Sequence, residues 1–140
     1  MVALELARSG ADLKGVVSFH GALATTQPAV GGQMKAKVLV CHGVLDPFIT
    51  LENVTTLTNE MQTAGVDLQV ILYGGAKHGF TNPAADGFGR PGVAYHKPSD
   101  VRSWAAMRQF FTELFSSYPE STGTSARVRK EASRRDHGSR

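Results

Sequence analysis

The 140-residue sequence predicts an α/β protein built on a small parallel sheet. Three short apolar segments, at residues 15–19, 37–42 and 68–73, alternate along the chain with helix-like segments. The central one, Lys-Val-Leu-Val-Cys-His, is apolar at four consecutive positions, which is typical of a strand buried on both faces of a parallel sheet. Strands that alternate with helices favour parallel pairing through right-handed crossovers.

The first two helices carry recognisable end signals. Residues 1–9 are mostly strong helix formers, and Gly10 is a natural residue at which to end that helix. Thr50 is the expected N-cap of a second helix that runs to about Ala64 and stops at Gly65. One helix therefore precedes the first strand, and the other connects the second strand to the third.

A long loop, 74–98, separates the third strand from the last helix. It is rich in Gly, Pro and Asn, and loops of this length in compact domains are usually functional or mobile. Ser99 is the expected N-cap of the last helix, which should run to about Ser116. We expect Trp104, Phe110 and Phe111 to lie in the core. The apolar stripe of this helix comprises Val101, Trp104, Met107, Phe111, Leu114 and Phe115.

Composition excludes several classes of protein. Apolar residues make up 41% of the chain, which suits a globular domain, and no apolar run approaches the length of a membrane span. No signal-peptide pattern follows Met1, so a cytoplasmic setting is expected. The single cysteine, Cys41, rules out an internal disulfide and provides no metal-binding spacing.

The positive charge belongs to the C-terminal segment. Residues 1–118 carry nine basic and nine acidic side chains, so the whole net charge of +3 lies in residues 119–140. This segment is dominated by Ser, Thr, Gly, Ala and Arg, has no aromatic residue, and is expected to be disordered. Binding of nucleic acid or another anionic surface is an alternative that we do not favour, because acidic residues interrupt the basic ones and no aromatic residue could stack on bases.

Two residues follow the carboxyl ends of strands, where parallel sheets usually carry their functional residues. Asp46 follows the end of the second strand at His42, and His78 follows the end of the third strand at Tyr73. The carboxyl ends of adjacent parallel strands lie at the same edge, so both side chains should meet there. An Asp that accepts a hydrogen bond from one imidazole nitrogen leaves the other nitrogen free as a base. Alternatively, Asp46 is a turn residue before Pro47 and His78 is an ordinary loop histidine.

These segments resemble the dienelactone hydrolase family. Val-Leu-Val-Cys-His-Gly-Val-Leu-Asp-Pro at 38–47 is similar to the acid-bearing segment of that family, and Tyr-Gly-Gly-Ala-Lys-His-Gly-Phe-Thr-Asn-Pro at 73–83 to its histidine-bearing segment. Residues 2–8 resemble the helix after the family's nucleophile, and 94–111 its closing helix. The resemblance covers residues 1–118 and implies an α/β-hydrolase fold, cofactor-free hydrolysis of small esters or lactones, and a catalytic acid and base at Asp46 and His78.

The family's nucleophile is not found in this sequence. It stands in a Gly-x-Cys-x-Gly or Gly-x-Ser-x-Gly turn, whereas the only glycines four apart here, Gly75 and Gly79, enclose Lys77. Cys41 lies inside an apolar strand and is expected to be structural. We therefore expect a partial α/β-hydrolase fold that lacks its N-terminal strands and has negligible activity alone.

Two further questions stay open from the sequence. His20 and His42 each end a strand before a glycine, and either could line the cleft, although a hydrogen-bonded structural role is favoured. The chain could also be a non-enzymatic half-domain that associates with itself or with a partner through the exposed edge of its first strand, because unpaired strand edges readily pair.

Overall fold

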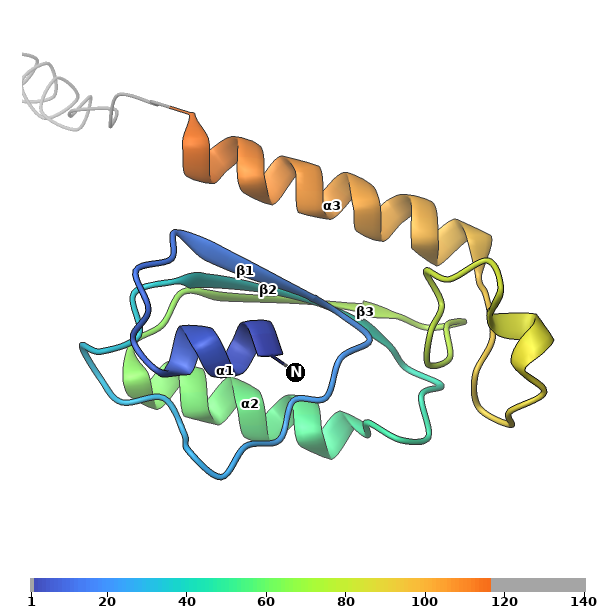
Figure 1. Ribbon diagram of the computed structural model, residues 1–140, viewed down its shortest axis with the longest axis horizontal. Coiled ribbons are helices and arrows are strands. Elements are labelled where there is room, and N and C mark those ends of the chain that lie inside the picture. The colour runs from blue at the N-terminus through green and yellow to red at the C-terminus, as the bar shows by residue number, and fades with distance from the viewer. Residues whose placement is uncertain (1, 117–140) are drawn as a thin grey trace, which may run out of the picture.

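The computed structural model describes residues 2–116, which form a three-stranded parallel sheet with helices on both faces (Figure 1). The strands β1 (Gly15–Phe19), β2 (Lys37–Gly43) and β3 (Leu68–Tyr73) lie in the order β1-β2-β3. The predicted α/β class and the three strand positions are confirmed. The predicted disordered tail, 119–140, lies outside the described residues.

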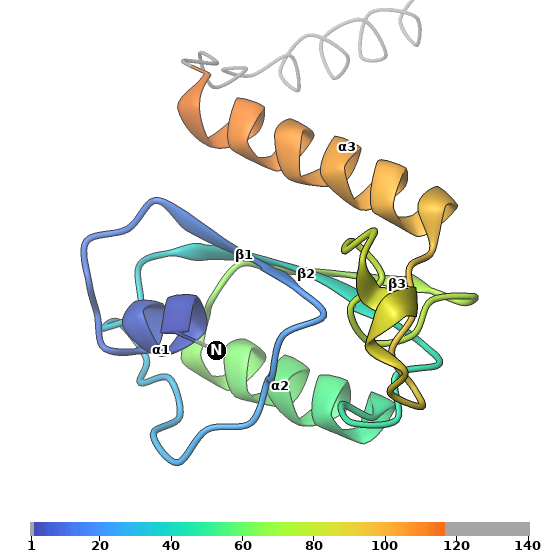
Figure 2. The ribbon, with the colours of Figure 1, turned by 45° about the vertical axis from the view of Figure 1, so that its right-hand side comes forward.

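Helices cover the two faces of the sheet unequally. Helices α1 (Val2–Arg8) and α2 (Leu51–Ala64) lie on one face, and α3 (Lys97–Phe115) lies alone on the other, as the two ribbon views agree (Figure 1 and Figure 2). None of the helices in residues 2–116 is long and apolar enough to cross a membrane.

The central strand β2 divides the core in two. Val38 and Val40 pack against α1 and α2, whereas Leu39 and Cys41 face the α3 side. All four side chains are almost fully buried, because successive residues of a strand point to opposite faces and both faces are covered. This explains the uninterrupted apolar run that the sequence shows here.

The ends of α2 agree with the sequence signals. Thr50 is extended before the helix, and its backbone N–H donates to Asn53 Oδ1 at 2.9 Å. Gly65 ends the helix in the left-handed conformation, with φ of 71°, which glycine adopts without steric cost.

The start of α3 differs from the prediction. The helix begins at Lys97 with His96 as its N-cap, so the expectation that Ser99 caps it is wrong. Pro98 occupies the first turn, where its fixed φ favours the helix and its missing N–H costs no hydrogen bond. Ser99 lies within that turn instead, and its Oγ is 2.7 Å from His96 Nδ1.

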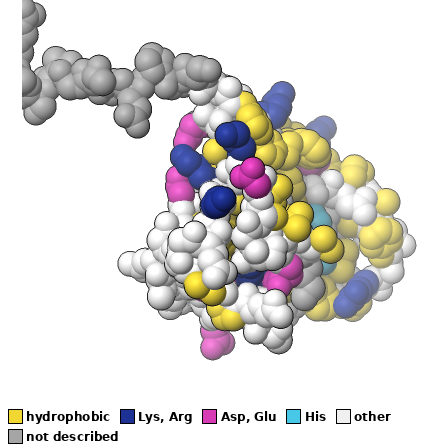
Figure 3. Space-filling model, turned by 60° about the vertical axis from the view of Figure 1, so that its left-hand side comes forward, with side chains coloured by type: hydrophobic (Ala, Val, Ile, Leu, Met, Phe, Trp, Pro, Cys, Tyr) yellow, Lys and Arg dark blue, Asp and Glu magenta, His cyan; other side chains and the backbone are white. Residues whose placement is uncertain are grey.

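Helix α3 also exposes apolar side chains of its predicted stripe, and Phe111, expected in the core, is only partly buried. Phe110 is buried, but Trp104 is 50% exposed and rests against Phe19 of β1, with ring centroids 5.7 Å apart. Val101 and Phe115 are more exposed still. The apolar stripe is wider than the surface that three strands can cover. In the space-filling view, apolar side chains occupy much of the right-hand side, with histidines among them (Figure 3).

Candidate active site

Asp46 and His78 meet at the carboxyl edge of the sheet. β2 and β3 pair in parallel with Gly43 opposite Tyr73, so the segments that follow them leave the sheet side by side. His78 Nδ1 lies 2.8 Å from Asp46 Oδ2, within hydrogen-bond distance. A carboxylate oxygen can only accept, so the imidazole carries its proton on Nδ1 in this contact.

The Asp46 carboxylate is buried and fully bonded. Its side chain has no exposed surface, and Oδ1 accepts the backbone N–H groups of Phe48 at 2.8 Å and Ile49 at 3.1 Å. These bonds form an Asx turn before α2, so the alternative of Asp46 as a turn residue is also part of the geometry. The turn aims the second oxygen at the imidazole.

Two glycines permit the close approach of the loops. A Cβ on Gly43 would lie 2.5 Å from Ala76 O, so only glycine lets the end of β2 pass against the loop that precedes His78. Gly92 has φ of 85°, and a side chain there would collide with the ring of Pro47. Gly92 O accepts the His78 N–H at 3.1 Å, and His78 O accepts the Ala94 N–H at 3.1 Å.

The loop 74–96 that carries His78 is ordered by these contacts. It contains a short 3₁₀ helix, η1 (Ala85–Phe88), and a bridge between His78 and Val93. The His78 side chain keeps 32% of its surface exposed. Its ring meets Phe48 edge-to-face at 5.4 Å, and the Arg90 guanidinium lies 4.4 Å above the Phe48 ring. Sequence reasoning missed Phe48 and Arg90, although Phe48 follows Asp46 by only two residues.

Cys41 does not take part in this arrangement. Its side chain is buried in the core on the α3 side, with Tyr73 Oη at 3.9 Å from Sγ. Burial raises the pKa of the Cys41 thiol to about 11, so the thiol stays protonated near neutral pH. No hydroxyl or thiol group within residues 2–116 is hydrogen-bonded to His78.

The two histidines that were left open have different environments. His42 is 1% exposed, and neither ring nitrogen has a hydrogen-bond partner among the described residues, so the expected bonded role is not found. Burial lowers the pKa of His42, which favours the neutral form of the ring. His20 does form a hydrogen bond, with Nε2 at 2.9 Å from Thr81 Oγ1, and it also contacts the His78 ring.

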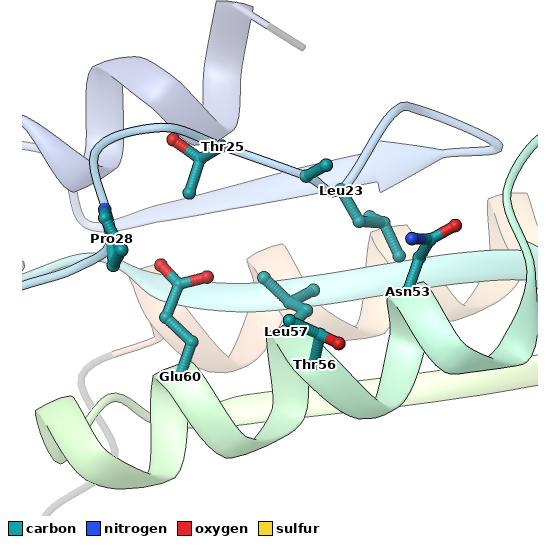
Figure 4. Close-up of a pocket in the computed structure, with 8 residues that line it drawn as sticks. Leu23, Thr25, Pro28, Asn53, Thr56, Leu57 and Glu60 are labelled. Carbon is teal, nitrogen blue, oxygen red and sulfur yellow. The ribbon is translucent and has the colours of Figure 1, made fainter.

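A small pocket lies apart from the pair. It is a cavity of about 170 Å³ between α2 and the loop after β1, and most of its wall is apolar (Figure 4). Its acidic group, Glu60, already accepts hydrogen bonds from Arg8 and from the Ala29 N–H, which leaves little polar capacity for a ligand. The residues that line it are Leu23, Ala24, Thr25, Pro28, Asn53, Thr56, Leu57 and Glu60. Within residues 2–116, no three His, Cys, Asp or Glu side chains are grouped so as to hold a metal ion.

Comparison with protein families identifies the relatives of this chain. The model of the dienelactone hydrolase family matches residues 1–115. The uncharacterized protein K02A2.1 of Caenorhabditis elegans is 32% identical over 120 residues, which cover 82% of this chain and 74% of that protein.

Solved structures of similar proteins cover the same region. A protein named m3DLH matches with a TM-score of 0.76 and 46% identity, over 81% of this chain and 48% of its own. A dienelactone hydrolase-like promiscuous phosphotriesterase, P91, from metagenomic libraries matches with a TM-score of 0.76 and 43% identity, over 81% of this chain and 47% of its own. The present chain thus spans about half the length of these solved relatives.

Proposed function

Because the chain belongs to the dienelactone hydrolase family, we propose that it is the acid- and histidine-bearing part of an ester or lactone hydrolase. The observation that carries this proposal is the 2.8 Å contact between Asp46 Oδ2 and His78 Nδ1 at the carboxyl edge of the sheet. The partial coverage of the solved relatives supports a second half that would supply the nucleophile.

In the complete enzyme, His78 acts first as a base. Nε2 takes the proton of a Cys or Ser nucleophile as that group attacks the substrate carbonyl, and the resulting imidazolium gives the same proton to the leaving oxygen. In the second step Nε2 takes a proton from water as the water oxygen attacks the acyl group on the nucleophile. The imidazolium returns this proton to the nucleophile as the bond between nucleophile and acyl group breaks and the carboxylic acid product leaves. Asp46 holds the Nδ1 proton throughout, which keeps Nε2 as the reactive nitrogen and stabilises the positive charge on the ring.

The chain by itself should have negligible activity. Its sequence has no Gly-x-Ser/Cys-x-Gly turn, and losing the nucleophile of a triad lowers kcat by roughly six orders of magnitude. The test is hydrolysis of p-nitrophenyl acetate by the full chain, compared with Cys41→Ala and His78→Ala variants. A phosphotriester belongs in the same assay, because one relative is named a phosphotriesterase. Turnover that survives Cys41→Ala but is lost in His78→Ala would reveal a nucleophile in this chain.

A second candidate function is that of a half-domain that pairs through the edge of β1. Within the described residues, β1 has a strand neighbour on one side only. The helices that pack against β1 expose apolar side chains on both faces of the sheet, since Leu6 of α1 is 48% exposed and Trp104 of α3, which contacts Phe19 of β1, is 50% exposed. An exposed strand edge with apolar flanks is typical of a pairing surface.

Sedimentation at several protein concentrations tests this candidate. Self-association should weaken in Leu6→Lys and Trp104→Lys, because a charge at the flank opposes burial. It should persist in Val30→Lys, a matched change at an exposed valine in the loop between β1 and β2. A wild-type chain that is monomeric at every concentration would contradict self-pairing.

A further inference from the structure

His20 is held in an unusual backbone conformation. Its φ is 40°, and it is the one non-glycine residue within 2–116 with a positive φ. It directly follows β1, and its N–H donates to Cys41 O at 3.0 Å. A residue with a Cβ is strained at a positive φ, whereas glycine is not. Such strained residues cluster at functional sites. The side chain of His20 is therefore the feature to explain.

That side chain joins the end of β1 to the loop that carries His78. His20 Nε2 lies 2.9 Å from Oγ1 of Thr81, which follows His78 by three residues. The His20 ring also meets Phe80 edge-to-face, with centroids 5.3 Å apart and the planes at 79°. Phe80 is fully buried, so this segment of the loop is anchored beside β1.

The His20 ring forms one wall around His78. The His78 ring has Asp46 at Nδ1, Phe48 against it at 5.4 Å, and His20 against it at 5.4 Å with the planes at 65°. Burial, and to a lesser extent the nearby His78, lowers the pKa of His20. A neutral His20 can hydrogen-bond the Thr81 hydroxyl without placing a second positive charge beside an imidazolium at His78.

We propose that His20, held by Thr81, is a positioning residue that fixes the plane of the His78 ring and shields its hydrogen bond to Asp46 from water. The inference rests on the proposed function, because the position of the His78 ring matters only if Nε2 reacts. It goes beyond that function by assigning a role to a second histidine at the edge of the sheet.

The test reads the hydrogen bond itself, in the full chain, by NMR of the imidazole N–H protons. The wild type should show a slowly exchanging Nδ1–H of His78 that disappears in Asp46→Asn. In Thr81→Val and His20→Phe, exchange of this proton with water should accelerate roughly two- to tenfold, which is the effect of losing one neutral hydrogen bond. Thr81→Ser keeps a hydroxyl and should retain the wild-type rate.

A matched control separates the positioning of the His78 ring from a general loss of stability on removal of a threonine hydroxyl. Thr55→Val removes a hydroxyl that bonds only within the exposed face of α2, at Leu51 O, and should leave the His78 proton unchanged. Amide spectra establish that each variant keeps its fold, and if Thr81→Val does not fold, His20→Phe carries the test. A wild-type rate in the variants would overturn the positioning role and leave the proposed function standing. Absence of the signal from the wild type would overturn both.

Discussion

The carboxylate of Asp46 has no exposed surface and lies 2.8 Å from Nδ1 of His78, whose side chain is about one-third exposed. The acid is therefore shielded from water, while the imidazole that it orients reaches the surface at the edge of the sheet. Burial strengthens a hydrogen bond to a charged group because water does not compete for it. A buried carboxylate beside an accessible imidazole is the arrangement that the proposed hydrolytic role needs.

Replacing Asp46 separates its local role from its contact with His78. Asp46→Ala should lower the free energy of unfolding by about 2–4 kcal/mol, because the partly buried N–H groups of Phe48 and Ile49 lose their acceptor. Asp46→Asn keeps an oxygen for these groups and should cost about 1 kcal/mol. Urea denaturation measures both. Equal losses in the two variants would show that the Asx turn does not stabilise the chain.

Gly43 should tolerate no side chain. Gly43→Ala would place a Cβ 2.5 Å from the backbone oxygen of Ala76, so we expect a loss of about 2 kcal/mol or more in stability. The same change should move the loop before His78 and weaken the contact with Asp46. Gly74→Ala is the matched control, because no atom lies within 4 Å of a Cβ there, and its effect should stay within about 0.5 kcal/mol. Equal melting curves for the two variants would refute the close approach.

The buried ion pair of Arg8 and Glu60 should make stability depend on pH. Burial by itself would raise the pKa of Glu60, but hydrogen bonds from Arg8 and from the Ala29 N–H outweigh it and lower the pKa below its usual 4.5. The folded state therefore binds the proton less readily than the unfolded state. This stabilisation is fully present above about pH 4.5 and is lost as the pH falls through the lowered value.

Urea midpoints measured between neutral pH and acid check this dependence. The wild type should lose stability on acidification, and Glu60→Gln should flatten that part of the profile while being less stable at neutral pH. Glu52→Gln changes an exposed carboxylate on the same helix and should leave the profile unchanged. An identical slope in Glu60→Gln would assign the acid sensitivity to other groups.

Cys41 should resist alkylation while the chain is folded. The thiol has no exposed surface, so the reagent cannot reach the sulfur in the folded chain. Its pKa is raised to about 11, so only a small fraction is the reactive thiolate at pH 8. Iodoacetamide labelling followed by mass spectrometry should be slow in buffer and fast in concentrated urea. Labelling of the native chain as rapid as that of the unfolded chain would contradict the buried position.

The ends of α2 and α3 show which structural features a local sequence pattern can predict. Gly65 and Thr50 mark the ends of α2 correctly, because a left-handed glycine and an N-cap act within a few residues of the helix. The prediction of Ser99 as an N-cap is wrong although serine is a good N-cap residue, because Pro98 and the extended backbone of His96 place the N-cap of α3 three residues earlier. Trp104 fits the apolar stripe but is half exposed. Periodicity shows which face of a helix is apolar, but it does not show whether the sheet is wide enough to cover that face.

By itself, the sequence determined the α/β class, the three strands, and Asp46 and His78 as the candidate pair. These follow from strand periodicity, glycine positions and the order of residues along the chain. The tertiary structure alone decided the distances that give the pair its geometry, the burial of Arg8 against Glu60, and the link from His20 to Thr81 across 61 residues. Such contacts depend on strand register and loop packing, which local patterns do not encode.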